Sequence, residues 1–295
     1  DQAIELPFDH GELQLKKRWA FARTLRYSNY HRAFVLPNSL KSALIPAMAG
    51  IPRRIGWRGE YRYKLLTDLR ILHETRFPRM IDRYMALGFP ANLALSANQL
   101  PEAPPLPQLA VDEASQAALI KTHGLETTRL VGLCPGAEFG PAKQWPLDRF
   151  ADLAKRLVDE GYQVLLLGSP NDAEDAALIM DQVPEPKRSE FVNLTGQTLI
   201  PEVVDLIGLT QAVVTHDSGL MHVAAATGRP LVALYGPSSP VHTPPLSESA
   251  VTLTHPVPCH PCFERECPLK HQACLSELSV DEVFQALVSQ MNRLV

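Results

Sequence analysis

Residues 216–230 read His216-Asp217-Ser218-Gly219-Leu220-Met221-His222-Val223-Ala224-Ala225-Ala226-Thr227-Gly228-Arg229-Pro230. The apolar run Ala212–Thr215 comes before this stretch, and the apolar run Leu231–Tyr235 follows it. This order predicts a strand, a tight turn, a helix and a second strand. Because two strands joined by a helix are the repeating unit of a parallel sheet, this stretch decides the fold class.

The turn after the first of these strands has the composition of an anion-binding site. A helix N-terminus carries unpaired backbone N–H groups and the positive end of the helix dipole, and both favour a phosphate. Asp217 or Ser218 can cap this helix, and Gly219 lets a ligand approach the backbone. An ordinary capped helix without a ligand is the alternative.

The rest of the second half continues the alternation of strands and helices. We predict strands over 129–134, 162–167 and 191–194, and helices over 147–160, 172–181 and 201–209. This pattern predicts a parallel sheet with helices on both faces. Because ligands bind beyond the carboxyl ends of such strands, we expect a binding crevice among five loops. These loops are 135–143, 168–172, 195–198, 215–219 and 236–239.

The loop that follows the strand at 129–134 runs from Pro135 to Pro146 and contains two glycines and Lys143. An ammonium group just before a helix start suits a diphosphate. The loop lacks the Gly-Lys-Ser/Thr of a Walker motif. A solvated lysine is the alternative, but a second anion-ready helix start on the same sheet edge favours a binding role.

A proline-rich stretch, residues 101–108, separates the two halves of the chain. Proline removes hydrogen-bond donors and stiffens an extended chain, so this run is the expected linker. We therefore expect an N-terminal domain over residues 1–100 and a second domain over 109–295, with a cysteine-rich loop and a C-terminal helix.

The first half is less regular than the second. It predicts a strand over 33–36, a helix over 39–50 that ends at glycine, and a helical segment over 84–87. Only one clear strand–helix unit is visible, and a complete Rossmann-like domain would need further strands before Asp1.

Composition narrows the function classes. The chain has 295 residues, 45% of them hydrophobic, which is typical of a globular protein with sizeable cores. The net charge of −4 argues against binding to nucleic acid through overall charge. No signal peptide is visible, and no run approaches the roughly 20 apolar residues that span a bilayer.

Four stretches together resemble the bacterial ADP-heptose:lipopolysaccharide heptosyltransferase family. They are LPNSLKSA (36–43), GIPRRIGWRGE (50–60), CPGAEFGPAKQWP (134–146) and DSGLMHVAAA (217–226). The resemblance implies an α/β fold of the GT-B type, with two Rossmann-like domains facing a central cleft and the N-terminal one incomplete. It also implies an enzyme that inverts the anomeric centre and requires no metal or other cofactor. Among these stretches, 36–43 and 50–60 favour the family members that add a heptose to the first heptose of the inner core.

The resemblance implies a donor site for ADP-heptose in the second domain. Its matching positions are Lys143, Asp217, Ser218, Gly219 and His222, and Glu138 and Asp172 are neighbouring candidates for sugar hydroxyls. We expect the lysine and the helix start to stabilise the departing diphosphate. A structural histidine is the alternative for His222.

The family normally begins with a strand and a glycine-containing loop that carries an acidic residue thought to activate the acceptor hydroxyl. No such segment precedes Asp1, so the catalytic base stays unassigned and is expected before this residue. We therefore expect this chain to be inactive or nearly so, while still binding ADP.

A basic segment in the first half is the expected acceptor-facing patch. Arginine engages phosphates and carboxylates in bidentate fashion, and the acceptor core carries both. The residues are Lys41, Arg53, Arg54, Arg58, Arg62 and Lys64. A solvated face of alternating arginines is the alternative.

Four of the five cysteines lie within residues 259–274: Cys259, Cys262, Cys267 and Cys274. A C-x-x-C pair can place two sulfurs on one metal, and four thiolates complete a tetrahedral zinc site. The later spacing is not a standard zinc-finger pattern, and free thiols in a folded loop are the alternative. A catalytic role for these cysteines is not expected.

The expected function is transfer of L-glycero-D-manno-heptose from ADP-heptose to heptosyl-Kdo-lipid A. We expect a cytoplasmic enzyme in peripheral contact with the inner membrane, with no nucleic-acid partner. The alternatives are another nucleotide-sugar transferase of this fold, a nucleotide-sugar-binding fragment without turnover, and an interaction domain organised by a metal-bound cysteine cluster.

Overall fold

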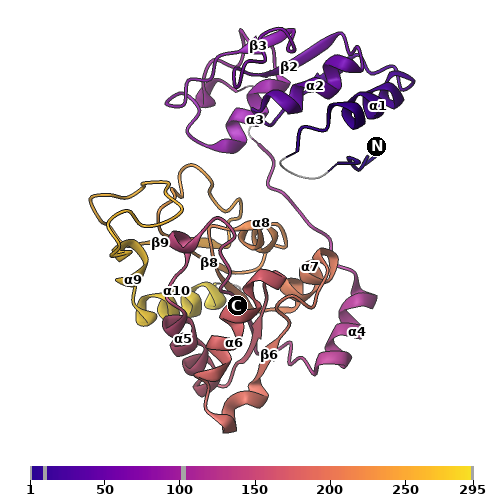
Figure 1. Ribbon diagram of the computed structural model, residues 1–295. Helices are drawn as coiled ribbons and strands as arrows, with labels where there is room; N and C mark the ends of the chain where they lie inside the picture. Colours follow the sequence, from indigo (N-terminus) through magenta and orange to yellow (C-terminus); the bar gives the residue numbers. More distant parts are fainter. Residues whose placement is uncertain (1, 9–11, 101–103, 294–295) are drawn as a thin grey trace. The chain divides into compact units, whose positions relative to one another are not determined.

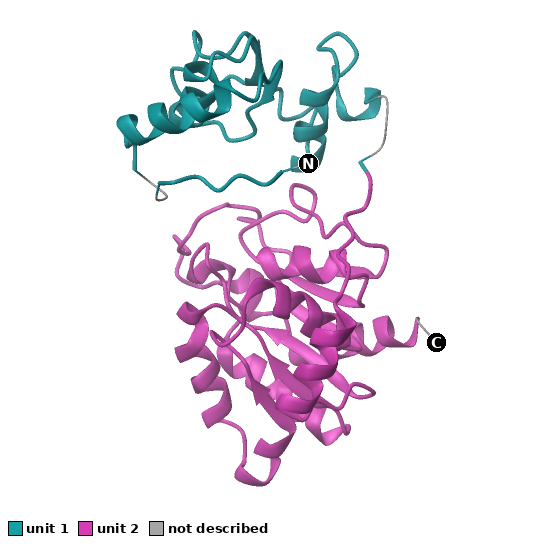
Figure 2. Ribbon diagram, turned by 90° about the vertical axis from the view of Figure 1, so that its right-hand side faces the viewer, with its two compact units in different colours: residues 1–104 teal, residues 105–295 magenta. Residues whose placement is uncertain are grey.

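The computed structural model describes residues 2–8, 12–100 and 104–293. The chain forms two compact units, residues 1–104 and residues 105–295 (Figure 2). The division falls within the proline-rich stretch 101–108, of which residues 101–103 lie outside the described residues.

Unit 2 contains β6, β8 and β9 (Figure 1) and is built on a six-stranded sheet. The strand order of this sheet is β6-β5-β4-β7-β8-β9. Every neighbouring pair of its strands is parallel, which confirms the fold class. The strands are β4 (Leu130–Cys134), β5 (Gln163–Leu166), β6 (Phe191–Asn193), β7 (Ala212–His216), β8 (Leu231–Tyr235) and β9 (Ala250–Thr254).

Helices cover both faces of this sheet. They are α4 (Glu113–His123), α5 (Leu147–Asp159), α6 (Ala173–Asp181), α7 (Ile200–Leu209), α8 (Gly219–Ala226), α9 (Ala273–Ser276) and α10 (Val280–Asn292). Adjacent strand residues point to opposite faces, so Val214 packs with residues of α5, α6 and α10, whereas Val213 packs with residues of α4, α7 and α8. The four central strands, β4, β5, β7 and β8, are therefore buried on both sides, as their apolar runs predict.

Helix α5 shows how the sequence sets this packing. Phe150, Leu153 and Leu157 recur at helical spacing and are fully buried against the sheet. The chain leaves the helix through Gly161, which has a φ of 86° that glycine adopts readily.

Unit 1 holds a three-stranded parallel sheet in the order β1-β2-β3. Its strands are β1 (Arg32–Phe34), β2 (Arg53–Trp57) and β3 (Asp68–Arg70), and its α-helices are α1 (Leu15–Arg26), α2 (Leu40–Met48) and α3 (Met80–Gly88). The sequence-based view of one strand–helix unit here was wrong. It missed β2 because this strand opens with two arginines, and β3 because it has only three residues.

Arg62 fixes the loop between β2 and β3. Its side chain is fully buried, and its guanidinium donates to the carbonyl oxygens of Trp57 and Pro37, each at 2.5 Å, and to Asn38 Oδ1 at 2.8 Å. Burial lowers the pKa of Arg62. This arginine therefore belongs to the packing of unit 1, which corrects its placement on the acceptor-facing patch.

Candidate functional site

Two loops of unit 2 meet at the carboxyl edge of the sheet. One follows β4 and carries Lys143 at the end of the short 3₁₀ helix η2 (Pro141–Lys143). The other is the turn between β7 and α8, which holds Asp217 and Ser218. Because β4 and β7 are hydrogen-bonded neighbours and run in parallel, both loops emerge on the same edge.

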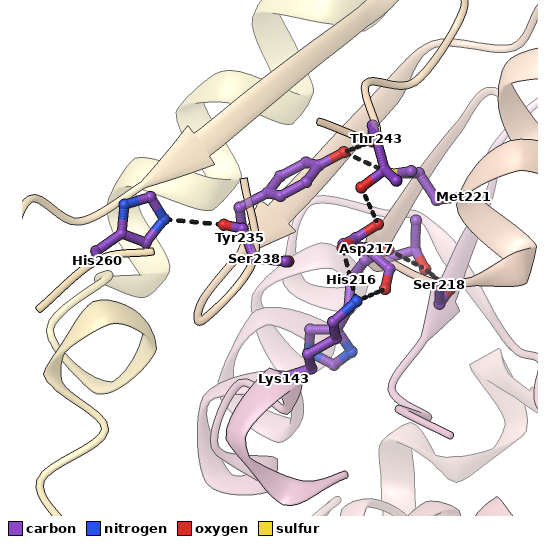
Figure 3. Close-up of polar contacts among 10 residues, drawn as sticks. Lys143, His216, Asp217, Ser218, Met221, Tyr235, Ser238, Thr243 and His260 are labelled. Atoms are coloured by element: carbon purple, nitrogen blue, oxygen red, sulfur yellow. Dashed lines mark hydrogen bonds and ion pairs between the residues drawn. The ribbon is translucent and has the colours of Figure 1, made fainter. Parts of the chain in front are cut away.

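Lys143 and Asp217 form a close ion pair at this edge (Figure 3). Lys143 Nζ lies 2.6 Å from Asp217 Oδ2 and also donates to the Asp217 carbonyl oxygen at 3.2 Å. The two side chains are only 15% and 7% exposed. The second carboxylate oxygen, Oδ1, accepts from Thr243 Oγ1 at 3.2 Å. Asp217 therefore fixes the position of the ammonium group.

The N-terminus of α8 has no side-chain cap among the described residues. Ser218 is the N-cap residue, but across the described chain no side chain caps this helix. The Ser218 hydroxyl instead contacts Thr215 Oγ1 at 3.2 Å, so the expected capping by Asp217 or Ser218 was wrong. A Cβ built at Gly219 would meet no described atom within 4 Å. The first N–H groups of α8 and the open space before them suit an anion.

Tyr235 holds Thr243, the residue whose hydroxyl donates to Asp217. Its hydroxyl donates to the Thr243 carbonyl oxygen at 2.6 Å and also contacts Met221 Sδ at 3.2 Å (Figure 3). Burial raises the pKa of Tyr235, and the nearby Asp217 carboxylate raises it further. The phenol therefore stays a neutral donor and ties the loop after β8 to the site.

His216, the last residue of β7, is fully buried beneath the site. Its Nε2 accepts from the backbone N–H of Trp145 at 2.8 Å, and its Nδ1 lies 3.3 Å from the Gly136 carbonyl oxygen. Accepting at Nε2 requires the neutral tautomer with a proton on Nδ1, which then donates to Gly136. Burial lowers the pKa of His216 to about 4.

The other donor-site candidates, His222, Glu138 and Asp172, differ in exposure and in their hydrogen-bond partners. His222 is an exposed residue of α8, and desolvation by the neighbouring protein lowers its pKa, with a smaller contribution from Lys143. Glu138 is exposed, with Oε2 3.5 Å from Asn171 Nδ2. Asp172 has a local structural role, because its Oδ2 accepts from the backbone N–H and the hydroxyl of Ser169.

All six residues expected to face the acceptor lie in unit 1, which is described by itself. Arg53 pairs with Asp68 at 3.3 Å. Arg54 donates to the carbonyl oxygens of Leu65 at 2.6 Å and Ile51 at 2.5 Å.

The other residues of this basic segment are less constrained. Arg58 and Lys64 are exposed, and Lys41 is half-buried on α2. Arg58 and Lys64 therefore present their charge to solvent. The guanidinium of Arg54 instead donates hydrogen bonds to the backbone of unit 1.

The four clustered cysteines carry free thiols and line one small cavity of about 30 Å³. Burial raises the pKa of the Cys274 thiol, and the charges of the other three thiols add to this effect. Within the described residues, no three His, Cys, Asp or Glu side chains are arranged so that they could hold a metal ion. The loop that bears the cysteines packs on η2, because the Arg265 carbonyl oxygen accepts from Ala142 N at 3.0 Å.

Sequence reasoning missed His216, Thr243 and Tyr235 as parts of the site. His216 adjoins the recognised motif, but its partners lie 71 and 80 residues away along the chain. Thr243 sits in a proline-rich loop without periodicity. Tyr235 reads as the apolar end of a buried strand, and its hydroxyl contact gives no signal in the sequence.

Residues 18–273 match the profile of glycosyltransferase family 9 (heptosyltransferase). The chain belongs to this family. Lipopolysaccharide heptosyltransferase 2 of Escherichia coli is 49% identical over 251 residues, which cover 85% of this chain and 72% of that protein. The protein of the same name from Salmonella typhimurium is 44% identical over 293 residues, 99% of this chain and 84% of that protein.

Solved structures of family 9 agree with this assignment. The structure of E. coli ADP-heptose LPS heptosyltransferase II has a TM-score of 0.86 at 42% identity, over 95% of this chain and 82% of that chain. A family 9 glycosyltransferase from Veillonella parvula has a TM-score of 0.80 at 22% identity, over 96% and 80%, and shows the shared fold alone. The heptosyltransferase fold and the glycosyltransferase class predicted from the sequence are thereby confirmed.

Within residues 2–8, 12–100 and 104–293, no helix has the length and apolar character to cross a membrane.

The buried His216 gives unit 2 a defined pH dependence. The imidazole has a pKa of 6.5 in the unfolded chain, whereas burial lowers its pKa to about 4 in the folded chain. The unfolded state therefore binds more protons between these values, and the free energy of unfolding falls as the pH drops from 6.5 to 4. We expect a loss of about 3 kcal/mol, measured by denaturant unfolding at several pH values.

The matched control is His216→Gln, which has no group that titrates in this range. Between pH 6.5 and 4, the unfolding free energy of this variant should depend less steeply on pH than that of the unaltered chain. The difference should correspond to at most about one bound proton. Equal slopes in the two proteins would contradict the assigned protonation state.

Proposed function

We propose that this chain transfers L-glycero-D-manno-heptose from ADP-heptose to the first heptose of the lipopolysaccharide inner core. The single observation that carries the proposal is the Lys143–Asp217 pair beside the uncapped N-terminus of α8. The names of the related enzymes supply the sugar, the nucleotide and the lipopolysaccharide.

The diphosphate of the donor binds at the α8 N-terminus in this proposal. The backbone N–H groups of Gly219 and the next residues face the phosphates, and the helix dipole adds to their attraction. Lys143 has three N–H donors, two of which contact Asp217. The ammonium also lies 4.8 Å from the centroid of the Phe139 ring. We assign the third N–H donor to a phosphate oxygen. Asp217 thus orients the ammonium without contacting the phosphate itself.

The reaction is a single displacement that inverts the anomeric centre and needs no metal. An acceptor hydroxyl oxygen attacks C1 of the heptose, and the bond between C1 and the β-phosphate oxygen breaks. The electron pair of that bond goes to ADP, and the hydroxyl proton goes to a base that we leave unassigned. Lys143 and α8 stabilise the negative charge that grows on the diphosphate, which lowers the barrier rather than only binding the substrate.

The remaining donor-site candidates have secondary roles. Ser218 and His222 lie at the start of α8, within reach of the same end of the helix. Glu138 is exposed and suits a hydroxyl of the ribose or heptose. Asp172 keeps its neighbouring loop in place through Ser169 and is the weakest candidate for direct contact.

The acceptor binds through the basic residues of unit 1. Arg58 is exposed and is the leading candidate for a phosphate or carboxylate of the acceptor. Lys41, Arg53 and Arg54 supply further positive charge. Because the acceptor is a membrane lipid, the enzyme works in peripheral contact with the cytoplasmic face of the inner membrane.

Lys143→Met tests the donor site directly. Removing the ammonium takes away a charge-assisted contact to the diphosphate, so ADP should bind about tenfold to a hundredfold more weakly in calorimetry. Lys155→Met is the control, because Lys155 pairs with Asp152 on the surface of α5 and should leave the affinity unchanged. Equal affinity of the Lys143→Met variant and the unaltered chain would contradict the assignment.

The acceptor assignment needs its own assay. Labelled heptose from ADP-heptose should appear on heptosyl-Kdo-lipid A, and not on Kdo-lipid A lacking the first heptose, when the assay uses a chain extended at its N-terminus. ADP binding combined with transfer to another acceptor would contradict the acceptor and favour a different nucleotide-sugar transferase. A chain that does not bind ADP would contradict the donor.

We also propose that Cys259, Cys262, Cys267 and Cys274 bind a structural zinc ion. Thiolate sulfur is a preferred zinc ligand, and four of them complete a tetrahedral site. The C-x-x-C spacing and the single small cavity that all four side chains line support this proposal. Because these thiols are not already arranged around an ion, binding must deprotonate them and draw the sulfurs together.

Metal analysis of protein purified under reducing conditions tests the zinc proposal. About one zinc per chain is expected, and the double variant Cys259→Ser, Cys262→Ser should lose it. Cys134→Ala is the control, since Cys134 ends β4 and is buried away from the cluster. Protein that contains no zinc, or a double variant that keeps it, would contradict the proposal.

A further inference from the structure

His216 connects the two ends of the loop that carries Lys143. One ring nitrogen contacts Gly136, near the start of this loop, and the other contacts Trp145, near its end. The imidazole is fully buried, and its ring packs edge-to-face on Phe150 at 5.3 Å between centroids. Its position is therefore fixed by packing as well as by hydrogen bonds.

A neutral imidazole suits this position because it offers one donor and one acceptor on opposite sides of a rigid ring. The Trp145 N–H needs an acceptor, and the Gly136 carbonyl oxygen needs a donor. An imidazolium would present two donors and lose the bond from Trp145. An apolar side chain would take this partner from both backbone groups and leave the buried Trp145 N–H unpaired.

The same turn supplies the ion-pair partner of Lys143. Asp217 follows His216 directly in the chain, so one short segment at the end of β7 holds both the loop ends and the lysine tip. Asp217 fixes the ammonium end of Lys143, and the loop backbone fixes where this long side chain begins, so the position of the ammonium depends on both. A shift of the loop by about 1 Å would move the ammonium out of hydrogen-bond range of its target.

We propose that His216 is a positioning residue for the donor site: by clamping Gly136 and Trp145, it holds the loop so that Lys143 reaches the N-terminus of α8. This inference rests on the proposed function in one respect, namely that ADP binds at this edge. His216 does not touch the nucleotide, so its effect must pass through Lys143.

A graded set of substitutions tests the clamp. His216→Gln keeps one donor and one acceptor, His216→Asn is shorter and keeps one contact at most, and His216→Leu keeps none. ADP affinity in calorimetry should fall in this order, by at most about twofold for Gln and about tenfold for Leu. If the Leu variant does not fold, the Asn variant supplies the comparison.

The double-variant cycle separates positioning from general stability. In the Lys143→Met background, His216→Leu or His216→Asn should cause no further loss of ADP affinity, because the group that it positions is gone. An equal loss in both backgrounds would overturn the proposal, and so would a folded Leu variant with unchanged affinity.

Amide hydrogen exchange of the nucleotide-free protein tests the clamp without relying on ADP binding. The Trp145 N–H should exchange at least about tenfold faster in His216→Leu or His216→Asn than in the unaltered chain, and His216→Gln should retain protection. Unchanged protection would overturn the clamp. If the unaltered chain fails to bind ADP while the exchange result holds, the proposed function fails and the clamp stands.

Discussion

The ion pair between Lys143 and Asp217 is the interaction on which the site depends. It joins the loop after β4 to the turn after β7, and only a parallel sheet brings these two loops to one edge. The two charges offset each other, so the attraction for an anion comes from the remaining lysine donor and the N-terminus of α8. A site built on such a pair favours an anion whose shape matches the remaining donors as well as one with negative charge.

Burial makes this pair costly unless its polar atoms are satisfied. The desolvation of two ions can exceed their mutual attraction, so a buried pair by itself is weak evidence for stability. Here Thr243 hydrogen-bonds to the second carboxylate oxygen, and Tyr235 holds the backbone of Thr243. These two hydrogen bonds hold the ion pair in one arrangement, and a binding site requires such a fixed arrangement of its polar groups.

The sequence predicted the parallel sheet of unit 2 because its strands are short, apolar and separated by helical stripes. It missed β9, whose residues are mostly half-buried, and α4, in which only Leu119 is buried. It placed Lys143 and Asp217 on one edge because the alternation of strands and helices predicts parallel strands, whose carboxyl ends share an edge. It could not find the partners of His216 or the Tyr235 contact, because these depend on residues that are distant in the chain.

The most direct test of the account is a crystal structure of the chain with ADP bound. The diphosphate should lie at the start of α8, with phosphate oxygens about 3 Å from the Gly219 N–H and from Lys143 Nζ. Asp217 should remain paired with the lysine in that complex. A diphosphate bound at another loop of the sheet, or one that leaves Lys143 without a phosphate contact, would contradict the central claim.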